Sequence, residues 1–113
     1  MTTVQPTLRP PELQLEGCII EITSNAPSTP GKPKYRYRVR EVSGPYPPDP
    51  NWYARPRIGG WTLVCEDLRE GISGNRTRWI NEVFVENGRI FAYPWRDEIV
   101  VIERSAEQQL SMF

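Results

Sequence analysis

The sequence contains no histidine, only two lysines among its fourteen basic residues, and no long apolar run. Histidine is the commonest general base and a frequent zinc ligand, so its absence argues against triad and metal chemistry. No segment approaches the ~20 apolar residues of a membrane-spanning helix, and the N-terminus lacks a signal-peptide pattern. We therefore predict a cytoplasmic protein that is not an enzyme, with no metal, no cofactor, no membrane contact and no evident small-molecule substrate.

Cysteine is also scarce. Cys18 and Cys65 both lie in apolar, strand-like segments, where a free cysteine behaves as a small buried hydrophobic residue. Because no export signal is evident, we favour a reduced pair over a disulfide.

Proline, in contrast, is abundant, with eleven of twelve residues between positions 6 and 56. Proline is excluded from helix interiors and central strands, so the N-terminal half must contain long irregular connections. No segment has a convincing helical period, whereas short segments rich in β-branched and aromatic residues recur. The predicted strands are residues 13–23, 34–42, 60–68, 82–86, 89–93 and 95–103.

These strands predict one all-β domain, a small five- to six-stranded barrel or rolled sheet of SH3-like or, alternatively, OB-like kind. Residues 13–103 would form the barrel. Residues 1–12 and 104–113 are polar or proline-rich and are predicted to be a flexible N-terminal arm and a flexible C-terminal tail.

The pair Asn87-Gly88 between two apolar runs predicts a type I′ hairpin, because both central residues must accept a positive φ. A two-residue loop fixes the pairing of the flanking strands. The expected pairs, moving away from the turn, are Glu86 with Arg89, Val85 with Ile90, Phe84 with Phe91, Val83 with Ala92 and Glu82 with Tyr93. The first pair would be an ion pair and the third a pair of stacked rings.

We find no catalytic constellation. The carboxylates of Glu66-Asp67 and Asp97-Glu98 are sequence neighbours on predicted strands, so they point to opposite faces and do not converge on one substrate. We interpret them as solvated charges at strand ends.

A strictly alternating segment places three arginines on one face of the second strand, about 6–7 Å apart. Further basic and aromatic residues follow in the long connection 43–59, and aromatic rings offer surfaces on which bases stack. The candidate nucleic-acid-binding residues are Arg36, Arg38, Arg40, Arg55, Arg57, Trp52 and Tyr53. The alternative is that the arginines solubilise an outer strand face and pair with glutamates of a neighbouring strand. For the aromatics of 43–59, we favour a role in capping the open end of the barrel over a role as a polyproline-type ligand.

The chain ends in Gln109, Leu110, Ser111, Met112 and Phe113, which is apolar where termini are normally polar. This pentapeptide resembles the motif Gln-Leu-Ser/Asp-Leu-Phe, by which bacterial replication and repair proteins dock on the DNA sliding clamp. Met112 replaces a leucine of similar volume. The resemblance implies that Gln109 hydrogen-bonds at the mouth of a clamp groove, while Leu110 and Phe113 fill apolar pockets with Met112 beside them.

The sequence thus predicts an accessory protein recruited to the sliding clamp, with a barrel that contacts DNA near its arginines. The alternative is an SH3-like protein-interaction module unrelated to replication, with the tail folded onto its own barrel. Such a module would use Trp52 and Tyr53, or Phe84 and Phe91, as its contact surface.

Overall fold

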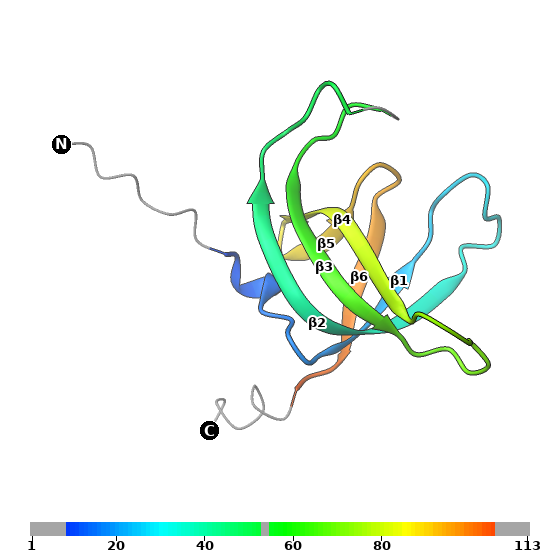
Figure 1. The fold of residues 1–113 in the computed structure, drawn as a ribbon. Helices are drawn as coiled ribbons and strands as arrows, with labels where there is room; N and C mark the ends of the chain where they lie inside the picture. The colour runs from blue at the N-terminus through cyan, green and yellow to red at the C-terminus, as the bar shows by residue number, and fades with distance from the viewer. Residues whose placement is uncertain (1–8, 53–54, 106–113) are drawn as a thin grey trace.

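In a computed structural model, which describes residues 9–52 and 55–105, six antiparallel strands close into a barrel (Figure 1). The strands are β1 (Ile19–Thr23), β2 (Lys34–Tyr46), β3 (Gly60–Asp67), β4 (Thr77–Glu86), β5 (Arg89–Ala92) and β6 (Asp97–Glu103). Each strand pairs with the next in sequence, and β6 returns to pair with β1. The prediction of a small all-β barrel of SH3-like or OB-like kind is confirmed.

The core is formed by the inward-facing residues of the strands, which alternate with outward-facing ones. In β3 the alternation is strict, so that Leu63 and Cys65 are buried while their neighbours are partly exposed. Removing one such aliphatic side chain from water contributes about 1.5–3 kcal/mol. Both cysteines are free and buried, and burial raises the pKa of the Cys65 thiol to about 12.

The expected first strand over 13–23 is wrong in its first six residues, because β1 begins only at Ile19. A 3-10 turn (Pro11–Leu13) precedes it, and Leu13 and Leu15 are fully buried in the core. Gly17 has a φ of +80°, which turns the chain into β1 instead of forming a bulge within a longer strand. Within residues 9–52 and 55–105, no helix has the length and apolar character to cross a bilayer.

Other boundaries also shift, and β4 begins at Thr77, five residues before its predicted start at residue 82. The second strand continues four residues past its predicted end at residue 42, because Ser43 pairs with Thr62 and Tyr46 with Gly60. The last strand begins at Asp97 instead of Trp95. The connection between β3 and β4 forms without a helix.

The β4–β5 hairpin has the predicted turn, with a φ of +52° at Asn87 and +77° at Gly88. All four ladder pairs from Glu86–Arg89 to Val83–Ala92 match the prediction, and the N–H of Tyr93 donates to the carbonyl of Glu82 beyond them. The centroids of the Phe84 and Phe91 rings are 5.8 Å apart.

The ion pair predicted at the turn is wrong. Glu86 pairs with Arg96 at 3.0 Å, and Arg89 pairs with Glu98 at 2.8 Å. Both ion pairs therefore link the hairpin to the segment that follows it, with one arginine on each side. Arg96 also lies over the Phe91 ring at 4.2 Å, so this aromatic pair is covered by a cation and is not a bare contact surface.

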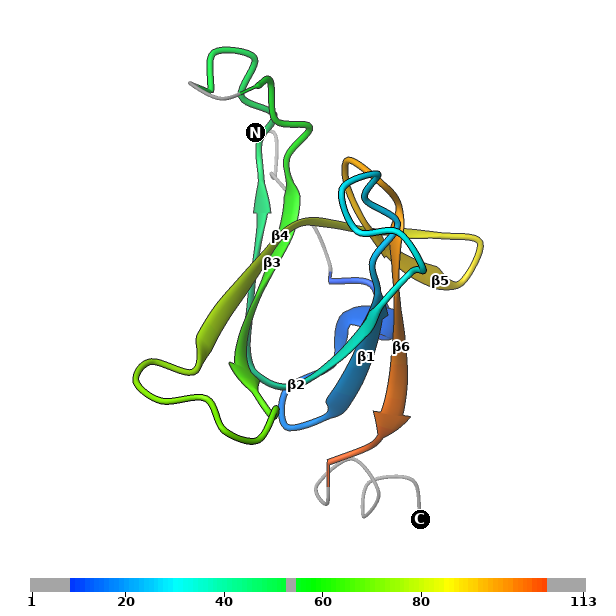
Figure 2. The same cartoon turned by 90° about the vertical axis from the view of Figure 1, so that its right-hand side faces the viewer.

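The two ends of the barrel carry different connections. The proline-rich connection 47–59 projects from one end, and the last residues of β6 leave at the other (Figures 1 and 2). The turn 68–76 lies at the same end as the last residues of β6. Ser105, the last described residue, packs against Gly17, where an added Cβ would lie 2.9 Å from the Ser105 Cβ.

Candidate binding sites

The three arginines of β2 lie on the outer face of the barrel, and two of them are paired with carboxylates. Arg36 donates to Glu21 of β1 at 3.2 Å, and Arg40 donates to Glu66 of β3 at 2.6 Å. Arg38 donates to the Gly17 carbonyl at 3.4 Å and has no carboxylate partner within 4 Å among the described residues. The arginine face is therefore partly neutralised, as the glutamate-pairing alternative expects.

Arg55 and Arg57, the other two basic candidates, converge on one buried carboxylate from β4. Arg55 makes a two-pronged contact with Glu82, with nitrogen–oxygen distances of 2.8 and 3.0 Å, and Arg57 approaches the same group at 3.7 Å. The Glu82 side chain is only 3% exposed. This arrangement fastens the long connection 47–59 to the barrel, so these arginines are structural anchors as well as candidate ligand contacts.

The position of Glu82 depends on an irregularity in the sheet. The pairing of β3 with β4 shifts between Trp61 and Leu63, and Glu82 has a φ of +56°, which is rare for a residue with a long side chain. The shift makes Glu82 and Val83, adjacent in sequence, both buried. The Glu82 carboxylate thereby also accepts from the N–H of Ile58 at 3.4 Å.

A pocket of about 340 Å³ opens beside this anchor, between the connection 47–59 and the outer faces of β3 and β4. Tyr46, Pro47, Pro48 and Trp52 contribute apolar rings to its lining, and Thr62, Asn81 and Glu82 contribute polar groups. The lining residues are Tyr46, Pro47, Pro48, Asp49, Trp52, Arg57, Gly59, Gly60, Thr62, Asn81 and Glu82. Arg57 stacks over the Trp52 ring at 3.9 Å. Tyr46 is 51% exposed, so the expectation that the aromatics of this region cap the barrel is wrong for Tyr46.

Two glycines allow the pocket to form. An added Cβ on Gly59 would lie 2.5 Å from the Tyr46 carbonyl oxygen, and one on Gly60 would lie 2.8 Å from the Val83 carbonyl oxygen. Both glycines also have positive φ values, at +83° and +106°. Only glycine fits such close backbone approaches, so the pocket wall is built into the backbone and is preorganised.

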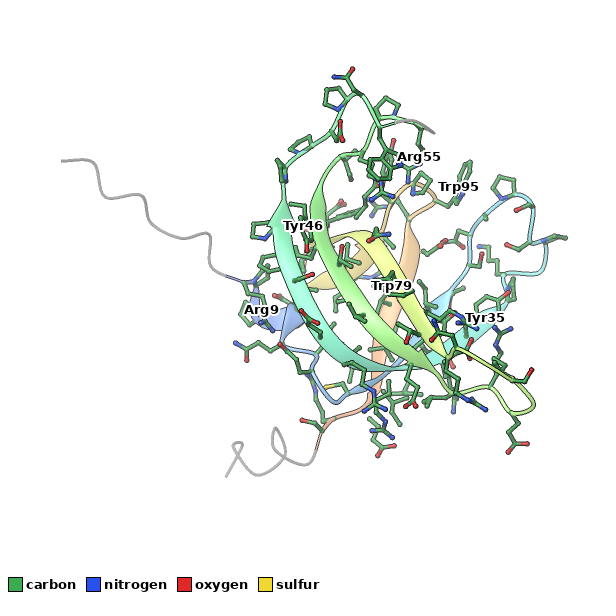
Figure 3. The ribbon with its side chains drawn as sticks, in the orientation of Figure 1. Arg9, Tyr35, Tyr46, Arg55, Trp79 and Trp95 are labelled. Carbon is green, nitrogen blue, oxygen red and sulfur yellow. The ribbon has the colours of Figure 1, made fainter. Side chains whose placement is uncertain are left out.

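Sequence reasoning missed Tyr46, Trp79, Asn81 and Glu82 as site residues. Trp79 is 59% exposed on the outer face of β4, one row below the Thr62–Asn81 pair (Figure 3). A partial signal was present, because the alternation within Thr77–Asn81 places Trp79 and Asn81 on one side, but the pairing shift at Glu82 turns that side outward, opposite to Val83.

At the opposite end of the barrel, Asp67 is fully buried, so its interpretation as a solvated strand-end charge is wrong. Its carboxylate accepts from Arg69 at 2.8 Å and lies 3.4 Å from Arg78. Hydrogen bonds from Arg69 overcome the effect of burial and lower the pKa of Asp67 to about 2. A more open depression at this end, of about 690 Å³, mixes Lys34, Arg36 and Arg69 with Glu21 and Glu103.

Tyr53 and the peptide Gln109, Leu110, Ser111, Met112 and Phe113 lie outside the described residues. The structure thus brings Trp52, Arg55 and Arg57 together at one end and leaves Arg36, Arg38 and Arg40 as a separate row on β2. No protein-family model matches this chain, and the comparisons with curated proteins and with solved structures found nothing similar to it.

Proposed function

We propose that this protein is a non-enzymatic accessory factor that is recruited to the bacterial DNA sliding clamp through Gln109, Leu110, Ser111, Met112 and Phe113. The observation that carries the proposal is the pentapeptide itself, with a glutamine, a leucine, a serine and a terminal phenylalanine in the order of the clamp-binding motif. The proposal places the protein in the cytoplasm, with the clamp as its principal partner and DNA as a second one.

The architecture of the barrel supports a C-terminal peptide that binds outside its own domain. Each of the six strands pairs on both sides over at least part of its length, with β6 closing on β1, so no strand forms the edge of an open sheet. The described core is contributed by residues between Leu13 and Val101. A docking peptide that follows such a closed domain needs its partner's pocket to bury its apolar side chains.

The free energies of burial and of chain ordering predict that the peptide alone binds the clamp weakly. Burial of three apolar side chains contributes roughly 1.5–3 kcal/mol each, and ordering a free segment costs on the order of 2–5 kcal/mol. Because about 8 kcal/mol corresponds to a Kd near 1 μM, the peptide alone should bind at or below that strength. A second contact between the barrel and DNA would then raise the overall affinity.

The test is a calorimetric titration of a bacterial sliding clamp with the intact chain and with a chain that ends at Gln108. We expect the shortened chain to lose clamp binding while its Tm stays unchanged. Ser111→Asp is the matched control, because the motif accepts either residue, and it should bind like the intact chain. A large drop in Tm on shortening would support a tail folded onto its own barrel and would overturn the proposal.

The outer face of β2 is the proposed DNA contact. Exposed ion pairs such as Arg36–Glu21 and Arg40–Glu66 contribute only about 0–1 kcal/mol, so a phosphate can replace the glutamate at little cost. Replacing Arg36, Arg38 and Arg40 together by glutamine should weaken binding to a primed DNA duplex and reduce its dependence on salt. Binding that is unchanged in the triple variant would remove DNA from the proposal and leave the clamp contact intact.

A second candidate, a protein-interaction module, is favoured by one observation, the preformed pocket of prolines and aromatic rings at the end of the barrel where β2 ends. This candidate makes no use of the C-terminal peptide. An intact chain that binds a protein ligand at this pocket and fails to bind the clamp would favour this candidate over clamp recruitment.

A further inference from the structure

The walls of the pocket at Tyr46 and Trp52 have the chemistry that recognises proline. Tyr46, Pro47 and Pro48 form one side, and the Trp52 ring stands against Arg57 on the other. Flat rings and prolines pack well against the pyrrolidine rings of an extended polyproline II segment, which docks in aromatic-lined grooves. Such a segment is already extended in solution, so little ordering cost opposes its binding.

The floor of the pocket offers polar groups for a peptide backbone. The Thr62 hydroxyl donates to the Oδ1 of Asn81 at 3.0 Å, which fixes the amide group and leaves its Nδ2 hydrogens for another acceptor. A polyproline II segment makes no internal hydrogen bonds, so its carbonyl oxygens are available as acceptors. The Asn81 amide would therefore donate to a backbone carbonyl of a polyproline II segment, while the rings of the pocket pack against the prolines of the same segment.

The charge around the pocket favours a basic ligand over a nucleic acid. Asp49 lines the pocket, and its carboxylate accepts from the Asn51 N–H at 3.0 Å without a cation within 4 Å in the described chain. Glu41, which pairs with Val64 on the outer face, likewise lacks an ion-pair partner there. The arginine of the pocket, Arg57, is in contrast engaged by the Trp52 ring and by Glu82.

We propose that this pocket binds a proline-containing segment of a partner protein, with an arginine or lysine of that segment placed against Asp49. The exposed Trp79 ring, next to Asn81 along the outer face of β4, extends the surface for the continuation of the segment (Figure 3). The inference goes beyond clamp recruitment, because it makes the chain an adaptor with a protein ligand at one end of the barrel and its clamp peptide after the other.

The experiment uses the intact chain and an array of synthetic decapeptides. Each decapeptide has a Pro-x-x-Pro core and one arginine at a varied position, and each has a partner in which alanine replaces every proline. A fifteen-residue oligothymidylate serves as the nucleic-acid probe. We expect binding of a subset of the proline peptides, loss of binding with the alanine partners, and NMR shift changes centred on Tyr46, Trp52 and Asn81.

Two variants sharpen the result. Trp52→Ala should weaken the best peptide about tenfold or more, whereas Trp95→Ala, at an exposed tryptophan outside the pocket lining, should leave it unchanged. Asp49→Asn keeps an oxygen for the Asn51 N–H and removes the charge, so it should weaken arginine peptides about threefold with no change in Tm.

Binding of the oligothymidylate in place of the peptides, or binding of neither probe, would overturn the proposal. Equal binding of the proline peptides and their alanine partners would do the same. The array is repeated with the chain that ends at Gln108, and peptide binding should persist there. Peptide binding at the pocket and binding to the clamp are therefore measured in separate experiments, so the loss of one is distinguishable from the loss of the other.

Discussion

The two ends of the barrel each hold a buried carboxylate between two arginines, but the arginines come from different distances along the chain. Asp67, at the end of β3, is bound by Arg69 two residues later and by Arg78 on the next strand. Glu82 is bound by Arg55 and Arg57, which precede it by more than twenty residues. The contacts of Asp67 close a short turn, and the contacts of Glu82 attach a long connection to the barrel.

The difference in sequence separation indicates different roles for the two buried carboxylates. Asp67 and Arg69 close the turn that follows β3 through contacts between residues close in sequence, so we expect this carboxylate to serve stability. A long connection that is held at one point can be shaped into a binding wall, and the pocket at Tyr46 and Trp52 lies directly beside that point. We therefore expect variants at Asp67 to change stability, and variants at Glu82 to change stability and binding together.

Asp67→Ala is expected to have the largest effect on stability. It removes the hydrogen bonds to Arg69 and leaves two arginines around a buried void, at a cost of about 3 kcal/mol in the free energy of unfolding. Urea unfolding measures the change. Glu66→Ala, which removes the neighbouring exposed ion pair, is the control and should cost less than about 1 kcal/mol. Equal losses from both variants would contradict the structural role of Asp67.

Glu82→Ala should cost less, about 2 kcal/mol, because the Ile58 N–H donates to its carboxylate over 3.4 Å, a longer and weaker bond than the 3.0 Å bond from the Arg69 N–H to Asp67. Alanine retains a Cβ at the positive φ, so the variant tests the carboxylate and not the backbone. Hydrogen exchange should accelerate at Asp49 and Arg57, whose amides bond across the connection, while the amides of Leu63 and Cys65 stay protected. Uniform acceleration over the whole chain would contradict a local anchor.

Among the described carboxyl groups, Asp67 should contribute most to the pH dependence of stability below pH 4, although the pKa values of Glu16, Glu86 and Glu98 are also lowered. Folding lowers the pKa of Asp67 from 3.8 to about 2, so the folded state binds fewer protons than the unfolded state between these values. Its contribution is complete above about pH 4 and is lost as the pH falls towards 2. Asp67→Asn should flatten the slope of stability against pH in that interval. A slope that is unchanged in this variant would contradict the role of Asp67 and assign the acid sensitivity to the other carboxyl groups.

The smallest effect is expected at the exposed arginines on the outer face of β2. Arg36→Gln removes an exposed pair with Glu21 and should change the free energy of unfolding by less than about 1 kcal/mol, and less still in high salt. Thermal unfolding at two salt concentrations measures it. A change as large as that of Glu82→Ala would show that the arginine row is structural and would weaken its assignment to DNA.

Local chemistry made part of this fold predictable. The Asn87-Gly88 turn sets the register of β4 and β5, because a two-residue loop leaves one way to pair the strands. The alternation in β2 placed its three arginines on the outer face in the same way.

The candidate site was harder to predict because it depends on contacts between distant segments. The pairing shift that buries Glu82, and the meeting of Arg55 and Arg57 with it, follow from packing over more than twenty residues and leave no local pattern. Asp67 was predicted to be a solvated charge. Strand alternation instead places it inward, and its contacts with two arginines make a buried charge tolerable there.

The central claim, recruitment through the last five residues, is tested most directly by competition for the clamp groove. A labelled peptide with the sequence Gln-Leu-Ser-Leu-Phe is bound to a bacterial sliding clamp, and the intact protein is titrated against it while fluorescence anisotropy is recorded. We predict complete displacement by the intact protein and by its free decapeptide 104–113, and none by Phe113→Ala. A labelled peptide that stays bound at saturating concentrations of the intact protein would contradict the account.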